Sequence, residues 1–449
     1  MVRNNNKLKY DVIVIGAGHA GCEAALAAAR GNSKTLLVSI NMDTTELMPY
    51  GNEMGGAGQD LLIKEIDVMG GEILKNIKNN YINIRVDNKW IDYSVKTTKV
   101  LVDGRRYLLL MKKVLENQNN LDLRQGLVVD ICKDGYLYNL KTSDGITYSA
   151  YCVVVCTGTF LGGKIFWGEY ELEAGRQGEI CSRRLLESLK DYGFEFKRVR
   201  NYVAPLVDSK TINKGSLKRQ LFKEENSSFL SGNDLKVKRQ MHSYKTYINK
   251  NFVDYLLKNE DKIKSPGEHG NKYEDESISI ESVILRNKNR GRKEVFINPM
   301  GRNTTEVYLQ GLETALHEEL QTGMLKKLDG FEDIEITRPG YGIEYSILSP
   351  LQLKSDLQAK NMEGIYFAGL INGTRGYEES AAQGMVAGMN ASRKSKGLKS
   401  IYFKKEDSCT GMLIDSIVSG NNSRGLYRLN PGLEEYMTYK RKDINSKML

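Results

Sequence analysis

The sequence has no apolar run approaching the roughly 18 residues that a membrane-spanning helix needs. Its first nine residues are polar and lack the apolar segment of a signal peptide, so we expect a cytoplasmic protein that spans no membrane. Cysteine and histidine are scarce: the 6 cysteines form no C-x-x-C pair and the 4 histidines are dispersed, which predicts no metal site. Cys152 and Cys156 lie in an apolar run and are expected to be small core residues, with a redox pair as the alternative.

The length and composition are those of a multidomain globular protein. At 449 residues the chain is too long for one simple core, so we expect two or three domains. Hydrophobic residues at 40% and charged residues at 27% allow a sizeable core. The net charge of +9 favours an anionic partner such as nucleic acid or a polyanionic cofactor, and a compositional bias towards lysine and asparagine is the alternative.

The stretch Tyr10 to Arg30 organises the rest of the chain. Asp11 to Ile15 is a β-branched apolar run typical of a buried parallel strand, and an alanine-rich helix former follows from Cys22. Between them lies G-x-G-x-x-G, in which the first glycine makes a tight turn, the second admits a diphosphate and the third allows close packing of helix on strand. The sequence therefore predicts a dinucleotide site at this turn.

The following segments extend this unit. Lys34 to Ile40 reads as the second strand, and Asn41 stands where an acidic ribose ligand is common. A glycine-rich loop, Met48 to Gly58, is suited to lie along a bound ligand. Leu121 to Tyr151 reads as an antiparallel excursion, before a buried strand at Val153 that ends in Thr-Gly.

This order of elements predicts an α/β fold: a two-dinucleotide-binding, Rossmann-like FAD domain with an inserted α/β substrate domain. We place the first part of the FAD domain at residues 1–200, an inserted basic domain at 201–284, the second part of the FAD domain at 285–400 and a short remnant of a C-terminal helical tail at 401–449. In the insert we expect two polar helices, Ser216 to Glu225 and Val237 to Asn259. Their lysines and arginines form either an RNA contact or a solvated surface.

Five stretches carry a resemblance to a known family. They are the opening motif, G-T-F-L-G-G-K-I at Gly158, E-A-G-R-Q-G-E at Glu173, R-P-G-Y-G-I-E-Y at Arg338 and F-A-G-L-I-N-G-T-R-G-Y-E-E-S-A-A-Q-G at Phe367. On these motifs the chain resembles the MnmG (GidA) family, FAD enzymes that modify the wobble uridine of certain tRNAs together with a partner GTPase.

The resemblance implies FAD as cofactor, NADH as its reductant and methylenetetrahydrofolate as a one-carbon donor for C5 of a tRNA uridine. The implied FAD contacts are Gly16, Ala17, Gly18, His19, Ala20, Gly21, Asn41, Val128, Thr157, Gly158, Ser182, Gly369, Leu370, Ile371, Asn372 and Gly373. Arg105 and Arg176 are candidate phosphate or folate contacts. A homodimer is kept as an alternative to a monomer.

Departures from the family pattern put its chemistry in question. The family carries one cysteine where this chain has Tyr50 and another where it has Ser277, and a thiolate adds to a uracil ring more readily than a phenol or an alkanol. Leu370 replaces a glutamine beside the flavin. The family's C-terminal helical region is almost absent after residue 430, so we do not expect the partner GTPase to be retained.

Tyr50, Ser277 and Glu379 are the catalytic candidates that remain. We predict an FAD-dependent enzyme that modifies a uridine in tRNA or another RNA. A flavin oxidoreductase using NADH and a small molecule is the alternative, and a non-catalytic FAD-stabilised binding protein is a third reading.

Overall fold

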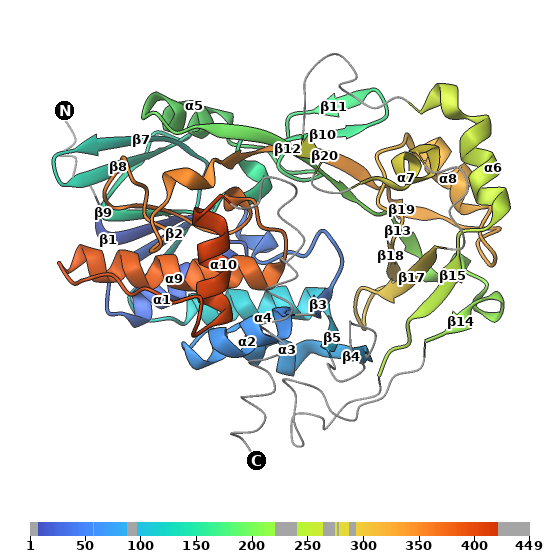
Figure 1. Ribbon diagram of the computed structural model, residues 1–449, viewed down its shortest axis with the longest axis horizontal. Coiled ribbons are helices and arrows are strands. Elements are labelled where there is room, and N and C mark those ends of the chain that lie inside the picture. The colour runs from blue at the N-terminus through green and yellow to red at the C-terminus, as the bar shows by residue number, and fades with distance from the viewer. Residues whose placement is uncertain are drawn as a thin grey trace.

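The computed structural model describes residues 8–56, 58–87, 97–220, 240–263, 274–275, 278–286 and 293–420. Figure 1 shows two units joined by a long strand pair, with the N-terminal elements and the final helices in one unit and most of residues 206–338 in the other. Within the described part of the chain no helix is both long and apolar enough to cross a membrane.

A seven-stranded sheet forms the centre of the first unit, in the order β6-β2-β1-β9-β8-β7, with β21 paired to β9. Its strands are β1 Leu8–Ile15, β2 Thr35–Ser39, β6 Leu121–Gln125, β7 Val128–Asp134, β8 Leu137–Thr142, β9 Thr147–Val155 and β21 Ile365–Phe367. β6, β2, β1, β9 and β21 run parallel, whereas β8 pairs antiparallel with β9 on one side and with β7 on the other. The expected βαβ unit and final buried strand are thus confirmed. The antiparallel excursion is confirmed only from β7 to β9, because Leu121–Gln125, expected as its first strand, pairs parallel with β2. The two stretches expected on either side of residue 152 form one continuous strand.

Two helices, α1 (His19–Arg30) and α9 (Tyr377–Ser395), lie side by side against this sheet (Figure 1). Glycines on α9 permit an unusually close approach: a Cβ at Gly384 would stand 2.0 Å from the Ala20 carbonyl oxygen, and one at Gly388 would stand 2.2 Å from that of Ala24. The small residues of both helices therefore bring the two N-termini to one edge of the sheet, where the parallel strands end.

A three-stranded sheet and a helical layer complete the first unit. The sheet is ordered β3-β5-β4, with β3 Glu53–Gly55, β4 Tyr81–Asp87 and β5 Thr97–Val102. The helices are α2 Gln59–Val68, α3 Ile73–Asn80, α4 Gly104–Glu116 and α5 Arg183–Asp191. β3 lies inside the glycine-rich loop, which is therefore anchored to this small sheet through pairing with β5.

The second unit is built on a six-stranded sheet in the order β14-β15-β17-β18-β13-β19. Its elements are β13 Leu206–Asp208, β14 Lys218–Arg219, β15 Tyr244–Tyr247, β17 Glu294–Pro299, β18 Glu306–Gln310, β19 Ile336–Arg338, α6 Lys250–Lys258, α7 Ile280–Arg286 and α8 Glu318–Leu325. One apolar core extends from Val207 to Ile334. This packed unit continues past residue 284, the boundary expected from the sequence.

The prediction of two polar helices in the insert is wrong for most of the residues that the structure describes there. β14 occupies Lys218–Arg219, and only Lys250–Lys258 of the second stretch is helical. Y-K-T-Y at 244–247 forms β15, because pairing with β17 on one side and β14 on the other buries Thr246. Residues 221–239 lie outside the described part of the chain.

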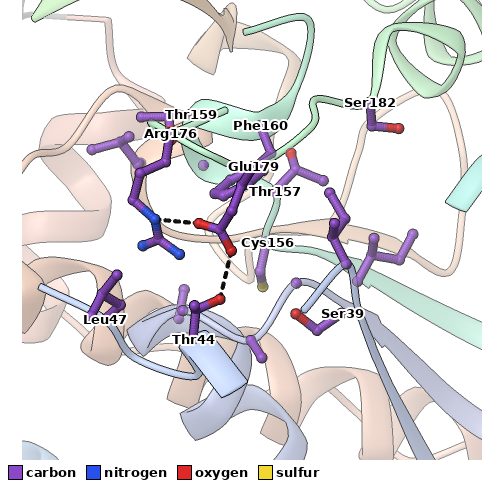
Figure 2. Close-up of a pocket in the computed structure, with 18 of the residues that line it drawn as sticks. Ser39, Thr44, Leu47, Cys156, Thr157, Thr159, Phe160, Arg176, Glu179 and Ser182 are labelled. Atoms are coloured by element: carbon purple, nitrogen blue, oxygen red, sulfur yellow. Dashed lines mark hydrogen bonds and ion pairs between the residues drawn. The ribbon is translucent and has the colours of Figure 1, made fainter. Parts of the chain in front are cut away.

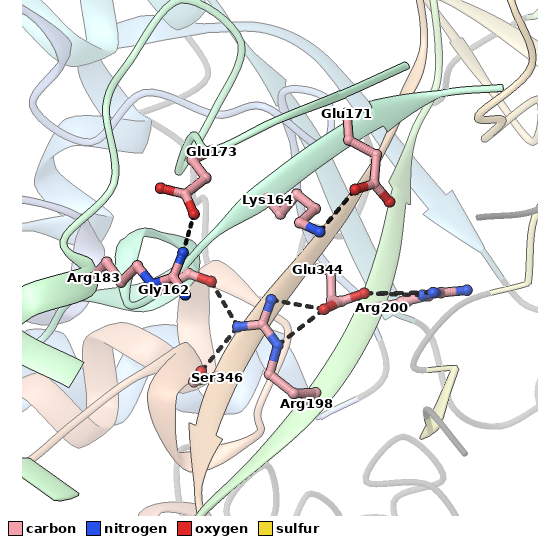
Figure 3. A network of polar contacts seen from close by, with 9 residues as sticks. All are labelled: Gly162, Lys164, Glu171, Glu173, Arg183, Arg198, Arg200, Glu344 and Ser346. Carbon is pink, nitrogen blue, oxygen red and sulfur yellow. Dashed lines mark hydrogen bonds and ion pairs between the residues drawn. The ribbon is translucent and has the colours of Figure 1, made fainter. Parts of the chain in front are cut away.

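A five-stranded sheet, ordered β11-β10-β20-β12-β16, connects the units. Its strands are β10 Lys164–Trp167, β11 Tyr170–Leu172, β12 Phe196–Val203, β16 Glu274–Asp275 and β20 Tyr341–Leu348. Figure 3 shows an ion network on the β12–β20 pair: Glu344 accepts from Arg198 Nη2 at 2.8 Å and lies 3.4 Å from Arg200 Nε. Arg198 also donates to the Gly162 carbonyl oxygen at 2.6 Å, so the network fixes this connection to the flanking loop.

The last described helix, α10 (Cys409–Val418), is held by an acid from α2. The Glu65 carboxylate accepts from the backbone N–H of Cys409 at 2.7 Å and from the N–H and hydroxyl of Thr410 at 2.8 and 2.7 Å. These bonds satisfy N–H groups of the first turn that have no partner inside the helix. The remainder of the expected C-terminal tail, 421–449, lies outside the described residues.

Replacing Glu65 with alanine is expected to loosen α10 and to lower the free energy of unfolding by about 1.5–3 kcal/mol, because bonds to a charged acceptor are lost together. Hydrogen exchange should show faster exchange of the Cys409 and Thr410 amides. Glu116→Ala, at the exposed end of α4, is the matched control and should change both measurements little. Equal effects of the two substitutions would contradict this role.

Candidate functional site: two adjoining cavities

The turn between β1 and α1 has the form expected of the glycine motif. Gly16 has φ +101°, and a Cβ on it would stand 2.5 Å from the Cys156 carbonyl oxygen. A Cβ on Gly18 would have no atom within 4 Å, so the space above the turn is open. Gly21 faces the turn itself, since its Cβ would stand 1.7 Å from the Gly16 carbonyl oxygen.

A cavity of about 1100 Å³ begins at this turn and follows the ends of the parallel strands. Of the residues predicted to contact the cofactor, those that line it are Gly16, Ala17, Gly18, His19, Ala20, Asn41, Val128, Thr157, Gly158, Ser182 and Leu370. Tyr50 and Arg176 line it as well, whereas Arg105 is exposed at the start of α4. We call this space the flavin cavity.

The other predicted contacts lie behind the wall of the flavin cavity. Gly369, Ile371, Asn372 and Gly373 belong to the short turn before α9 and are not among its lining residues, and neither is Gly21, which faces Gly16. The buried Asn372 amide donates to the Phe367 carbonyl oxygen at 2.8 Å and to Gln383 Oε1 at 2.9 Å. In this arrangement the asparagine fixes the turn that carries Leu370 into the cavity wall.

Two polar side chains of the wall are engaged with the backbone. Asn41 Oδ1 accepts from the Asp43 N–H at 2.9 Å, which leaves its amide nitrogen for a ligand. The Ser182 hydroxyl donates to the Val128 carbonyl oxygen at 2.7 Å. Ser182 therefore holds the start of β7, where Val128 lines the cavity.

An ion pair closes one side of the flavin cavity (Figure 2). Arg176 Nε lies 2.5 Å from Glu179 Oε2, and Thr44 donates to Glu179 Oε1 at 2.7 Å. The Arg176 guanidinium also lies over the ring of Phe160, 5.5 Å from its centroid. Thr44, Phe160 and Glu179 were missed as site residues, although E-A-G-R-Q-G-E had marked the segment that carries two of the four side chains.

The flavin cavity suits a dinucleotide with a diphosphate and an aromatic ring system. The N-terminus of α1 and the open space over Gly18 form an anion cradle. Thr157 Oγ1 and His19 Nε2 are buried and have no hydrogen-bond partner among the described residues. Burial lowers the pKa of His19 to about 3, so the imidazole is neutral, and it stacks on Tyr377 with centroids 4.6 Å apart. These orphaned atoms fit a bound FAD.

The family model described as "Glucose inhibited division protein A" matches residues 11–399 of this sequence. The chain belongs to the GidA family. It is 40% identical to the tRNA uridine 5-carboxymethylaminomethyl modification enzyme MnmG of Ligilactobacillus salivarius, covering 97% of this chain and 69% of the relative. It is 38% identical to the enzyme of the same name from Geobacillus thermodenitrificans, with 97% and 69% covered.

The solved structures agree with this assignment. Aquifex aeolicus GidA in its form II crystal matches with a TM-score of 0.88 and 33% identity over 96% of this chain and 71% of that chain. The form I crystal of the same protein matches with a TM-score of 0.85. GidA-family membership confirms the resemblance, the α/β fold class and the dependence on FAD that the resemblance implies.

A second cavity of about 990 Å³ adjoins the flavin cavity in this GidA-family chain. Tyr50, Arg375 and Tyr377 line both spaces. Across it lie Asn201 and Tyr202 from β12 and Tyr308 and Gln310 from β18, so the cavity lies at the junction of the two units. We call it the junction cavity.

Tyr377 orders the wall between the two cavities. The Tyr50 N–H donates to the Tyr377 hydroxyl at 3.1 Å, and that hydroxyl donates to the Gly51 carbonyl oxygen at 3.0 Å. Burial raises the pKa of Tyr377 above its usual range, so the phenol remains protonated. The Tyr377 hydroxyl thus holds the loop that carries Tyr50 and Gly51.

The structure places the remaining catalytic candidates in different locations. Glu379 lines neither cavity, whereas its neighbour Glu378, which the sequence analysis did not select, lines the junction cavity. Ser277 lies outside the described residues. Both cysteines of the apolar run are buried and free; burial raises the pKa of Cys152 to about 12, and Cys156 lines the flavin cavity.

Proposed function

We propose that this chain is an FAD-dependent enzyme that modifies a uridine base of tRNA at ring carbon C5. The observation that carries the proposal is the junction cavity, which shares Tyr50, Arg375 and Tyr377 with the flavin cavity. A base turned out of RNA would enter from the side of the second unit and reach the flavin at this shared wall. FAD, when bound, supplies a redox centre that accepts and returns a hydride.

The residues of the chain would hold the reactants and exclude water. Gly16 and Gly18 with the N-terminus of α1 would bind the diphosphate, and Asn41 would bind a ribose hydroxyl. Tyr50 and Tyr202 would pack on the faces of the entering base. NADH as reductant and methylenetetrahydrofolate as one-carbon donor complete the proposal.

The test uses purified full-length protein with its flavin. Incubation with unmodified tRNA transcripts, NADH and methylenetetrahydrofolate should give a uridine of higher mass on nucleoside analysis, and tRNA binding should weaken steeply as salt rises. tRNA from cells without the gene should lack the same nucleoside. Unchanged nucleosides in both experiments would refute the proposal.

Tyr50 favours a second candidate, a flavin oxidoreductase that uses NADH and a small acceptor. Tyr50 stands in the shared wall at the position of a family cysteine, and a phenol is a far weaker nucleophile near neutral pH than a thiolate. This candidate predicts rapid NADH oxidation with a small electron acceptor and no RNA bound after purification. Slow NADH oxidation that accelerates only with tRNA would contradict it.

A further inference from the structure

Two adjacent acids at the start of α9 point to different places. Glu378 is buried, accepts from the Gly55 N–H at 2.6 Å through Oε1 and lines the junction cavity. Glu379 folds back over the N-terminal Gly376 of its own helix, since a Cβ on Gly376 would stand 1.5 Å from Glu379 Oε2. Its other oxygen accepts from Gln59 Nε2 at 3.2 Å. Glu379 therefore packs against the helix start, and Glu378 is the one of the two acids that lines the junction cavity.

Three carboxyls line the junction cavity among the described residues, and they differ in basicity. Although burial opposes it, the charges of Lys99 and Arg85 lower the pKa of Glu53, and Lys99 Nζ lies 2.7 Å from it. Glu313 Oε1 accepts from the Gly311 N–H at 3.0 Å. A carboxylate held by cations is a weak base, so Glu53 is the poorest proton acceptor of the three. Of the other two, Glu313 is only partly buried and Glu378 is buried, which makes Glu378 the strongest candidate to accept a proton.

The surroundings of Glu378 raise its pKa well above the usual range, chiefly through burial and then through the charge of Glu379. The charged or titratable groups that line the cavity with it or act on its charge come from every element around it: Lys99 and Glu53 from the small sheet, Tyr107 from α4, Arg375 just before α9, Tyr377 and Glu379 at the start of α9, Tyr50 from the glycine-rich loop, and Glu313, Tyr202 and Tyr308 across the cavity. Of these, Lys99 opposes the shift. A carboxylate with a raised pKa removes protons more effectively than an ordinary glutamate once it is ionised.

We propose that Glu378 is the general base of the reaction in the junction cavity and removes the proton from the ring carbon that receives the one-carbon unit. This inference rests on the function proposed above. The π electrons of the uracil C5=C6 bond form the new bond from C5 to the methylene carbon of the iminium form of methylenetetrahydrofolate. The C=N π pair of that iminium passes to the folate nitrogen, which keeps the one-carbon unit, and the positive charge left at C6 is shared with N1. The C5–H bond then breaks, its electron pair restores the C5–C6 double bond and the proton passes to the Glu378 carboxylate.

The experiment measures tritium released to water from tRNA carrying [5-³H]uridine, under single turnover with NADH and methylenetetrahydrofolate. Glu378→Gln should lower the release rate by at least about a hundredfold, with flavin content and the KM for tRNA unchanged. Glu378→Asp should retain part of the rate. The wild-type rate should rise with pH through and above neutrality as Glu378 ionises, and the Gln variant should lose this dependence.

Glu281→Gln is the matched control. Glu281 is a buried carboxyl whose pKa burial also raises; it accepts from Thr314 Oγ1 at 2.8 Å and from the Ala315 N–H at 3.1 Å, and it lines neither cavity. The Glu281→Gln variant should have a lower free energy of unfolding than the wild type. Its rate of tritium release, calculated per molecule that contains flavin, should be unchanged.

The outcomes separate the two claims. Wild-type protein that releases no tritium from tRNA would refute the proposed function. If Glu378→Gln releases tritium as fast as the wild type, the assignment of Glu378 is overturned and the proposed function stands. The same holds if Glu379→Gln loses the release and Glu378→Gln keeps it. Should Glu378→Gln lose its flavin, Glu378→Asp decides: a slower release with flavin retained supports the assignment, and an unchanged rate contradicts it.

Discussion

Alanine in place of Gly16 is expected to leave a protein that folds and purifies without its yellow cofactor. At φ +101° an L-residue is strained, and the added Cβ would press on the Cys156 carbonyl oxygen at 2.5 Å. To relieve the backbone strain and the clash, the turn that presents backbone N–H groups to the diphosphate would have to move. A displacement costing about 3 kcal/mol corresponds to roughly a hundredfold weaker FAD binding. The visible absorbance of the purified protein and titration of the apoprotein with FAD give the measurement.

Gly135→Ala is the control for this substitution. Gly135 lies in the turn between β7 and β8 with φ +60°, and a Cβ there would meet no atom within 4 Å. The substitution should cost about 1 kcal/mol of stability and leave FAD binding intact. Full flavin content in the Gly16 variant would refute the predicted role of the turn.

Removal of the Glu344 carboxylate should give the largest stability loss among the predicted substitutions, about 3–5 kcal/mol for Glu344→Ala. Glu344 is 8% exposed and lies between Arg198 and the 7% exposed Arg200. Without the acid, two guanidinium groups of like charge remain close together on the strand pair that joins the units. Urea denaturation, followed by tryptophan fluorescence and by flavin release, would measure the loss.

Glu171→Ala tests whether an exposed ion pair in this region contributes as much to the free energy of unfolding as the buried one. Glu171 pairs with Lys164 at 2.8 Å, and both side chains are exposed by more than a third, at 42% and 37% (Figure 3). Exposed pairs contribute about 0–1 kcal/mol, so this variant should remain close to wild type. A loss as large as that of Glu344→Ala would contradict the explanation by burial.

The flavin cavity was largely predictable because its determinants are local. Gly16, Gly18 and Gly21 act through a turn and a helix that are contiguous in sequence, and periodicity marks the strand before them. Asn372 shows where this stops. Its motif locates the turn, but the sequence does not tell which side chains of a turn line the cavity and which, like Asn372, bond to the turn behind it.

The junction cavity was not predictable from local pattern. Tyr50, Tyr202, Tyr308 and Glu378 come from four distant segments and meet only when the second unit folds back over the first. Glu378 and Glu379 show the same limit within one motif: the sequence analysis selected Glu379, and Glu378 is the one that lines the junction cavity. Neighbouring helix positions differ by about 100° in direction, so the packing of α9 on α1 decides which acid faces the cavity.

The shared partition formed by Tyr50, Arg375 and Tyr377 has a kinetic consequence. A reactive group passed from one cavity to the other would have only the thickness of this partition to cross, so its path through solvent would be short. Hydrolysis competes only with species that reach open water, so adjoining chambers favour transfer to the acceptor over loss. In that partition the Tyr377 ring stacks on His19, and its hydroxyl donates to the Gly51 carbonyl oxygen, so this side chain is held in place between the two cavities.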